Sequence, residues 1–313
     1  MSVFAPTGLG WHLEKMGLTM DAYGGGRFSG NLAARNLVLP KGNVWYVDAG
    51  VSASKSGKSW NTAFKTIQEA INAHNALIDW SDWVDNFSVI VVAPGLYAEA
   101  LTPAYNAAII GLGSRSADAM AEIHPTTGAA LAGTALGLQL INLWLESEDA
   151  DVLDFGTVHG LHIKDCVLRV GDSQAGTKSF IDVSGSMKEA SIINTHFSSG
   201  AGTMAFGINC PVGCTYFHNT LIEHCIIDGI KSAGTGIYVD GSTVTTGTVI
   251  RDNVIRITGA GKGIDDNNGA CLCVNNHISV SVAGTAIETA NQFMTVGNHT
   301  VVANTGAIVD SGS

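Results

Sequence analysis

The residues best suited to chemistry are acidic side chains that recur directly after isoleucines. Asp265 follows Ile264 and Glu288 follows Ile287, and these two isoleucines are 23 residues apart. If both segments are equivalent strands on adjacent coils, the two carboxyl groups lie about 5 Å apart. That separation is compatible with a retaining glycosidase pair or with oxygen ligands for calcium. Because the chain is acidic overall, a solvated acidic face is the simpler interpretation.

Other reactive side chains favour structural roles. His277 and His299 are expected to stack on an outward face, with His196 further along, and solvated histidines are a simpler reading than a metal site. The six cysteines, at positions 166, 210, 214, 225, 271 and 273, are expected to be reduced and buried. Zinc binding at Cys210-x3-Cys214 and Cys271-x-Cys273 is the alternative, but neither spacing matches a finger or ribbon. We therefore predict no metal and no cofactor, and no phosphate-binding loop, dinucleotide fingerprint or Gly-x-Ser-x-Gly elbow is present.

Composition limits the classes of partner. The 313 residues carry a net charge of −11, which argues against nucleic acid as a partner, because phosphate binding requires a basic face. Only 14 % of the residues are charged, 46 % are hydrophobic and 38 are glycine, which suits short buried strands joined by tight turns. The apolar stretch 129–145 contains Gln139 and Asn142, so we interpret it as buried strands and expect no membrane partner. The N-terminal residues do not resemble a signal peptide, so we expect synthesis in a host cytoplasm.

The elements that must position these side chains form a repeat. Strand-like segments such as HIKDCVLRV, LIEHCIIDG and VIRDNVIRI align with separations of 22, 29, 30, 28, 23 and 22 residues. This alignment predicts one inward column at a bend, made of Trp144, Cys166, Thr195, Cys225, Asn253, Asn276 and Asn298. An asparagine there can adopt a left-handed backbone and can bond to the coils above and below. A second column of anchors follows in step, made of Ile237, Ile264, Ile287 and Ile308.

The repeat predicts an all-β chain, a right-handed parallel β-helix over residues 43–313. Strand alternation places Ile250, Ile255 and Ile257 inside and Arg251 and Arg256 outside. One helix is expected near 66–78, because Thr66 and Glu69 form a capping box before apolar residues at helical spacing: Ile67, Ala70, Ile71 and His74. Such a helix would cover the open end of the first coil, as solenoids require.

The run VWYVDAG, SWNTAFKTIQEAINA and VIVVAPGLYAEAL resembles the start of pectin-lyase-like β-helix proteins. The resemblance implies that catalytic groups lie on the outward face of the strands that begin like Gly-x-Gly-Ile. That face would present the catalytic candidates Asp265, Glu288, Asp182 and Tyr238, together with Asp154. Only Lys262 is near enough to serve a lyase as a base. Asp265-Asp266 and Arg256-Ile257 resemble polygalacturonase motifs, but in reversed order, and a Gly-His-Gly segment is missing, so we expect this face not to be an active site.

Residues 1–42 are Gly-rich, have no repeat, and are predicted to be an attachment arm whose anchors Phe4, Trp11, Tyr23 and Phe28 bind a partner. The sequence also ends in mid-repeat, which leads us to expect a neighbouring subunit on the last coil. Together with the resemblance to bacteriophage structural proteins, these features favour a virion protein: a capsid decoration, fibre or tail spike subunit, expected to be a homotrimer bound to other virion proteins. The alternatives are a polysaccharide lyase or glycoside hydrolase of the tailspike or pectinase type, and a glycan-binding adhesin that binds a surface glycan without turnover.

Overall fold

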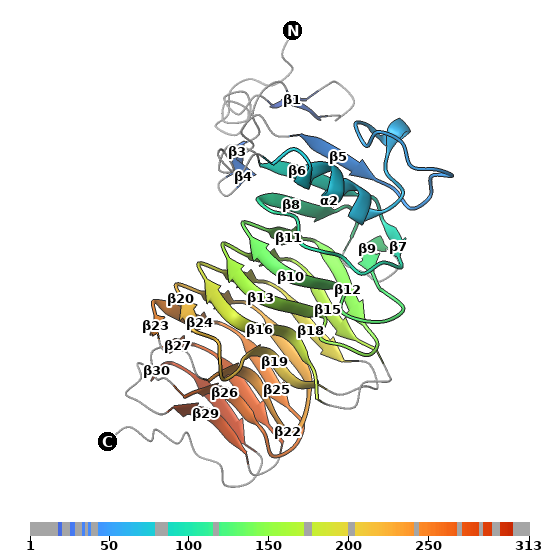
Figure 1. Ribbon diagram of the computed structural model, residues 1–313. Coiled ribbons are helices and arrows are strands. Elements are labelled where there is room, and N and C mark those ends of the chain that lie inside the picture. Colours follow the sequence, from blue (N-terminus) through green and yellow to red (C-terminus); the bar gives the residue numbers. More distant parts are fainter. Residues whose placement is uncertain are drawn as a thin grey trace.

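The computed structural model is a stack of parallel β-coils, as Figure 1 shows. It describes residues 18–20, 26–28, 33–34, 37–38, 43–78, 87–114, 119–171, 177–199, 204–240, 244–267, 271–281, 284–289 and 295–302. Within residues 43–302 every named strand pairing is parallel, and each strand pairs with the equivalent strands of the coils before and after it. The predicted parallel β-helix is therefore confirmed.

Three columns of strands make up the coils. The first is a ten-stranded sheet: β5 (Val44–Val47), β6 (Ser88–Val92), β8 (Ala107–Gly111), β11 (Gln139–Ile141), β14 (His162–Lys164), β17 (Ser191–Ile193), β21 (Leu221–Glu223), β24 (Thr248–Arg251), β27 (Cys271–Val274) and β30 (Thr295–Val296). The second comprises β7 (Gly95–Tyr97), β9 (Ala121–Ile123), β12 (Leu143–Ser147), β15 (Val167–Val170), β18 (His196–Ser199), the start of β22 (Ile226–Val239), β25 (Val254–Ile257), β28 (His277–Val280) and β31 (His299–Val302).

The third column carries the row of acidic candidates. It comprises β10 (Leu131–Leu136), β13 (Leu153–His159), β16 (Ser179–Lys188), β19 (Met204–Cys210), the end of β22, β26 (Lys262–Asp266) and β29 (Thr285–Thr289). Two short strands, β20 (Tyr216–His218) and β23 (Val244–Thr246), continue from the end of β16. Two antiparallel pairs precede the coils: β1 (Leu18–Met20) with β2 (Gly26–Phe28), and β3 (Ala33–Ala34) with β4 (Leu37–Val38).

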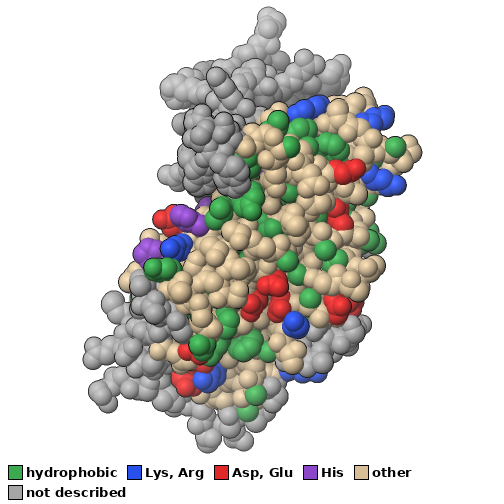
Figure 2. Space-filling view, viewed as in Figure 1, with side chains coloured by type: hydrophobic (Ala, Val, Ile, Leu, Met, Phe, Trp, Pro, Cys, Tyr) green, Lys and Arg blue, Asp and Glu red, His purple; other side chains and the backbone are tan. Residues whose placement is uncertain are grey.

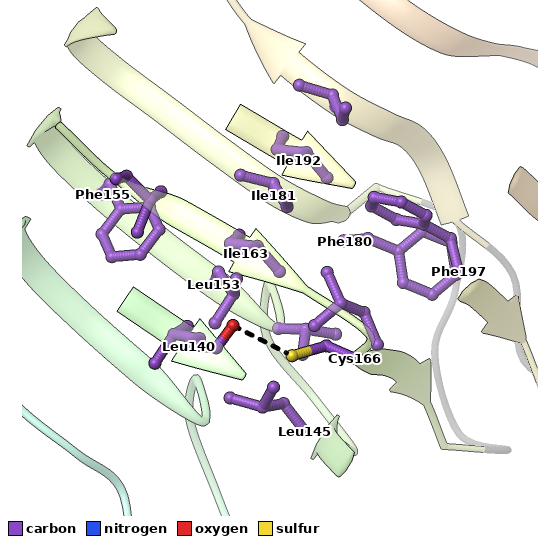
Figure 3. Packing of buried hydrophobic residues seen from close by; sticks show 14 of the residues in the cluster. Leu140, Leu145, Leu153, Phe155, Ile163, Cys166, Phe180, Ile181, Ile192 and Phe197 are labelled. Atoms are coloured by element: carbon purple, nitrogen blue, oxygen red, sulfur yellow. Dashed lines mark hydrogen bonds between the residues drawn. The ribbon is translucent and has the colours of Figure 1, made fainter. Parts of the chain in front are cut away.

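The core is built from columns of like side chains. Leu140, Ile163 and Ile192 are register partners on three successive coils, and all three are fully buried (Figure 3). Phe180 and Phe197 pack edge to face across the interior, with ring centroids 5.6 Å apart. The predicted alternation in β24 and β25 is confirmed, because Ile250, Ile255 and Ile257 are buried while Arg251 and Arg256 are exposed.

The inward bend column is confirmed for all but its first predicted member. Asn253 and Asn276 are buried, and they bond to each other and to backbone carbonyls of neighbouring coils. Trp144 does not belong to this column, because it pairs with Val167 on the outward side, and buried Leu143 takes the inward place.

The register of the bend column is marked by a residue with a left-handed backbone conformation (positive φ) just before each inward position. One such residue precedes the inward position in each coil: Asn142, Asp165, Asn194, His224, Asp252, Asn275 and Gly297. The expectation that the inward asparagines themselves adopt this geometry is wrong. Asn and Asp tolerate positive φ, so the turn uses them one position earlier and leaves the inward amide free for the ladder.

Helix α2 (Ile67–Asn75) is the predicted capping helix, with the capping box between Thr66 and Glu69 formed. Glu99 adds a second cap, because its two carboxylate oxygens accept from the backbone N–H groups of Ile67 and Gln68 at 2.7 and 3.0 Å. The four predicted inward residues of the helix are buried, and the helix lies against the first strands at the N-terminal end of the stack (Figure 1). A short 3₁₀ helix, η1 (Trp60–Thr62), precedes it.

Glycines in the third column let successive coils approach closely. A Cβ added to Gly236 would lie 2.6 Å from the backbone oxygen of Gly263 and 2.6 Å from Cγ2 of Ile255. Gly156 in β13 also has no left-handed φ, but a Cβ there would meet nothing within 4 Å. The Gly-x-Gly-Ile pattern is therefore a packing requirement of the strands that carry the acidic row.

We expect Gly236→Ala to lower the free energy of unfolding by about 1–3 kcal/mol, because the new methyl group overpacks a contact with backbone. Urea denaturation followed by circular dichroism measures this. Gly156→Ala is the matched control, and we expect it to be neutral or slightly stabilising. Equal stability of the two variants would show that the close approach of coils at Gly236 is not required.

Several expectations concern cysteines, membrane spans and the chain ends. All six cysteines are free and buried, and Cys166 and Cys225 lie two coils apart in the bend column. The stretch 129–145 forms β10, β11 and the start of β12, as predicted, and no helix among the described residues is long and apolar enough to span a membrane. Ile308 and the side chains of Phe4, Trp11, Tyr23 and Phe28 lie outside the described residues, so the attachment arm stays a prediction.

Candidate functional site

One outward row of polar side chains crosses six successive strands of the third column. Its members are register partners from coil to coil: Asp154, Asp182, Asn209, Tyr238, Asp265 and Glu288. Each member directly follows a buried apolar residue on its own strand, such as Ile264 before Asp265 and Ile237 before Tyr238, so strand alternation places its side chain on the outward side. We call this set the acidic row.

Lys262 joins the last two members of the acidic row. Its Nζ lies 2.7 Å from Asp265 Oδ2 and 3.1 Å from Glu288 Oε2, so the two carboxyl groups share one ammonium. Asp265 is only 2 % exposed, whereas the side chains of Lys262 and Glu288 are 34 % and 42 % exposed. A ligand on this face therefore meets Lys262 and Glu288 first.

Burial and ion pairing shift the pKa values of Asp265 and Lys262. Desolvation raises the pKa of Asp265 above its ordinary value, the bond to Lys262 offsets part of the rise, and the charge of Glu288 adds to it. Burial alone would lower the pKa of Lys262, but its bonds to Asp265 and Glu288 outweigh that effect and raise it. Asp265 can therefore retain a proton to higher pH than an ordinary carboxyl group, while Lys262 stays a cation.

The carboxyl groups in the first half of the acidic row, Asp154 and Asp182, also have raised pKa values. Asn209 donates from Nδ2 to Asp182 Oδ1 at 2.5 Å. Burial raises the pKa of Asp182, and the bond from Asn209 opposes this. Desolvation also raises the pKa of Asp154, with the charge of Asp151 adding to the effect.

An aromatic pair separates the two acidic halves. The rings of Phe206 and Tyr238 are stacked with centroids 5.2 Å apart and planes 29° apart. The hydroxyl of Tyr238 donates to Asp240, and burial, together with that carboxylate, raises the pKa of Tyr238 well above its ordinary value. Tyr238 therefore stays a neutral phenol and offers an aromatic face beside the carboxyl groups.

The structure brings all four catalytic candidates from the sequence into one row: Asp265, Glu288, Asp182 and Tyr238. Two contributors were missed, Asn209 and Phe206, although Ile208 keeps the same register as Ile181 and Ile237 and could have identified their strand. Lys262, the one base that the sequence placed near the acids, contacts both Asp265 and Glu288. Figure 2 shows acidic side chains gathered on this face, with basic side chains beside them.

A second cluster, on the outer side of β9 and β12, was also missed. Single ligand atoms of Glu122, His124 and Glu146 lie within 4.8 Å of one another, a spacing that suits a metal ion. However, Arg169 Nη1 contacts both oxygens of Glu146 at 3.0 and 3.1 Å, and Trp144 Nε1 donates to one of them at 2.9 Å. The guanidinium already neutralises the most buried carboxylate, so these residues fit a metal poorly.

The remaining candidates from the sequence are placed as follows. His277 and His299 stack with ring centroids 4.9 Å apart, and His196 belongs to the same outward column. Cys210 and Cys214 share a hydrogen bond, and burial raises the pKa of Cys210. Within the described residues no cysteine belongs to a group with metal-ligand spacing, so zinc at Cys210 and Cys214 gains no support.

Comparison with known proteins gives a fold and no closer relative. No protein-family model matches the sequence, and no curated protein matches it. Among solved structures, a pectin methylesterase from carrot has a TM-score of 0.55 at 15 % identity, covering 86 % of this chain and 85 % of that one.

Two further structures are similar at lower scores. A variant of DFA-IIIase from Arthrobacter chlorophenolicus A6, in complex with DFA-III, has a TM-score of 0.48 at 14 % identity and covers 83 % of this chain and 77 % of that one. YbhC from Escherichia coli has a TM-score of 0.46 at 14 % identity and covers 96 % and 99 %. The coil geometry and the match to the carrot structure together identify the fold as a pectin-lyase-like parallel β-helix.

Proposed function

We propose that the protein is a carbohydrate-active hydrolase that binds a polysaccharide along the acidic row and cleaves glycosidic bonds at Asp265 and Glu288. The observation that carries the proposal is the pair of carboxyl groups held on one ammonium, in which the buried member has the raised pKa. Two carboxyl groups with different environments are what glycoside hydrolysis requires. The proposal corresponds to the enzyme alternative that the sequence left open.

In this proposal the two acids have separate roles. Asp265, which retains its proton because it is desolvated, protonates the leaving oxygen as the general acid. Glu288, which is half-exposed and ion-paired with Lys262, attacks the sugar as the nucleophile. Both acids contact the same Nζ, so their carboxyl groups are close enough for the retaining mechanism, which requires about 5–5.5 Å.

Lys262 favours hydrolysis over elimination. A lyase needs a neutral base to remove a proton beside a carboxylate, and the raised pKa of Lys262 keeps it protonated at neutral pH. The stacked rings of Phe206 and Tyr238 lie two coils and one coil before Asp265, and they supply an apolar face on which a sugar ring can pack. A carrot enzyme named for the polysaccharide pectin has the same fold, although the charge of a substrate depends on the side chains of the row and not on the fold.

The test is incubation with a panel of neutral, amino-sugar and uronic-acid polysaccharides. We expect new reducing ends without ultraviolet-absorbing unsaturated products, and retention of anomeric configuration by NMR, because the two acids are close together. Unsaturated products would indicate a lyase, and methanol release from pectin without new reducing ends would indicate an esterase. Either result, or the absence of cleavage across the panel, would contradict the proposal.

The virion role predicted from the sequence remains a separate hypothesis. The carrot structure with the same fold is named as an enzyme, and the acidic row gives no reason for a virion role. Attachment through residues 1–42 and assembly as a trimer both stay predictions. A virion protein can itself degrade polysaccharide, so the hydrolase proposal does not depend on where the protein is located.

A further inference from the structure

Two buried acceptors in the acidic row have no hydrogen-bond partner. Asn209 Oδ1 and Asp265 Oδ1 account for two of the three such side-chain atoms among the described residues, and the third, Trp45 Nε1, lies on β5. The two residues are 8 % and 2 % exposed. Since Asn209 donates from Nδ2 to Asp182, its oxygen is the atom left to accept.

Unpaired buried acceptors are costly, and this cost points to the kind of group that would bind them. Leaving such an atom unsatisfied costs about 1–3 kcal/mol, so a ligand that donates an O–H or N–H to it recovers that energy. The two acceptors lie on either side of Tyr238, one coil away in each direction. A ligand with hydroxyl groups spaced along its length can therefore reach both across the aromatic pair.

The charge around these acceptors is negative. The charges of Asp151 and Asp154 raise the pKa of Asp182 at one end of the row, and the charges of Glu288 and Asp240 raise the pKa of Asp265 at the other. The described cations that pair with these groups are Lys262, shared by two carboxyl groups, and Lys178, paired with Asp151 at 3.5 Å. An anionic ligand would therefore meet repulsion from the carboxyl groups at both ends of the row, offset in part by Lys262 at one of them.

We propose that the acidic row selects glycans without negative charge, meaning neutral or amino-sugar polymers, and excludes uronic-acid polymers. This inference rests on the proposed function and specifies its substrate class. Sugar hydroxyls, and the N–H groups of an amino sugar, supply the donors that Asn209 and the ionised form of Asp265 lack. In its protonated form Asp265 donates from Oδ1 to the leaving oxygen instead. A uronate replaces a hydroxymethyl group with a carboxylate, so each residue loses a donor and gains a repelled charge.

The test measures binding, so that it is independent of turnover. A glycan array and calorimetry compare neutral, amino-sugar and uronic oligomers, including a matched pair of fully methyl-esterified and de-esterified galacturonan oligomers of equal length. We expect every bound glycan to be neutral or amino-sugar, with uronic oligomers bound at least about tenfold more weakly. This discrimination is expected to shrink as salt rises from low to high concentration, because screening shortens the range of charge repulsion.

A variant that reverses one charge on the row tests whether the glycan preference depends on electrostatics or on shape. Asp154 is exposed and has no proposed part in bond cleavage, so Asp154→Lys should raise affinity for de-esterified oligomers by about two- to tenfold. Glu189→Lys makes the same charge change beyond the far end of β16, where the side chain is 60 % exposed, and we expect no change in preference.

The outcomes distinguish this inference from the proposed function. Preferred binding of uronic oligomers by the unmodified protein, or the same shift from both lysine variants, would overturn the charge selection while leaving a glycan-binding row intact. Failure to bind any glycan would instead remove the proposed function, and the substrate class with it.

Discussion

Asp265→Asn is expected to abolish glycosidic cleavage while leaving the β-helix folded. An amide matches the carboxyl group in shape but cannot donate the proton that the leaving oxygen needs, and loss of a general acid typically lowers the rate about 10²–10⁴-fold. The raised pKa of Asp265 also sets the pH dependence, because the wild-type rate should fall as pH rises through that value. Initial rates of reducing-end release across pH measure both effects.

The Asp265→Asn variant should lose activity without losing stability, which distinguishes a catalytic role of Asp265 from a structural one. The folded pKa of Asp265 lies above the ordinary 3.8, so the folded state binds the proton more tightly than the unfolded state. As pH rises from the ordinary pKa of an aspartate to the raised pKa in the folded state, the contribution of Asp265 to the free energy of unfolding falls. Asp265→Asn should remove this loss and leave the protein no less stable at neutral pH.

Two controls make the activity result specific. Glu288→Gln should also lose activity, and added azide should restore part of it, because a small anion can replace a missing nucleophile. Arg256→Gln on β25 alters an exposed ion pair with Asp228 on β22, outside the acidic row, and should retain full activity. Full activity of Asp265→Asn, or a wild-type rate that rises with pH, would assign the proton transfer to another group.

The fold was predictable where apolar residues alternate strictly. Ile250, Ile255 and Ile257 identified the inward side of two strands, and the Thr66 capping box identified the helix. Prediction failed by one residue at Trp144, because Leu143 and Trp144 are both apolar and alternation alone does not choose between them. The left-handed Asn142 settles the register, and that signal depends on a backbone angle that the sequence only suggests.

The sequence predicted most of the residues of the candidate site, but it did not predict the contacts between their side chains. The isoleucine anchors keep step with the bend column, which placed Asp265 beside Glu288, and the register confirms it. Their shared bond to Lys262 and the unpaired oxygen of Asn209 depend on side-chain conformations, which spacing does not specify. Glu122 and Glu146 were missed because the aligned repeat begins at Trp144, so the preceding coil, which carries Glu122, was not part of it.

Asn276→Leu is expected to give a large loss of stability through the bend column. Asn276 Oδ1 accepts from the backbone N–H and the Nδ2 of Asn253 at 3.2 and 3.0 Å. Its own Nδ2 donates to the backbone oxygen of Ile250 at 2.9 Å and to Asn298 Oδ1 at 3.0 Å. Leucine is similar in size but makes none of these bonds, so buried groups on both neighbouring coils lose their partners.

Each orphaned buried group costs about 1–3 kcal/mol, so the free energy of unfolding should fall by at least that amount, as measured by urea denaturation. Asn298→Leu is the matched control from the same column. Its side chain is only partly buried, at the last described coil, so water can satisfy the groups it leaves and the loss should be smaller. An Asn276→Leu variant as stable as wild type would mean that the amide ladder contributes nothing beyond filling space. The coils would then be held in register by their apolar columns and backbone pairing alone.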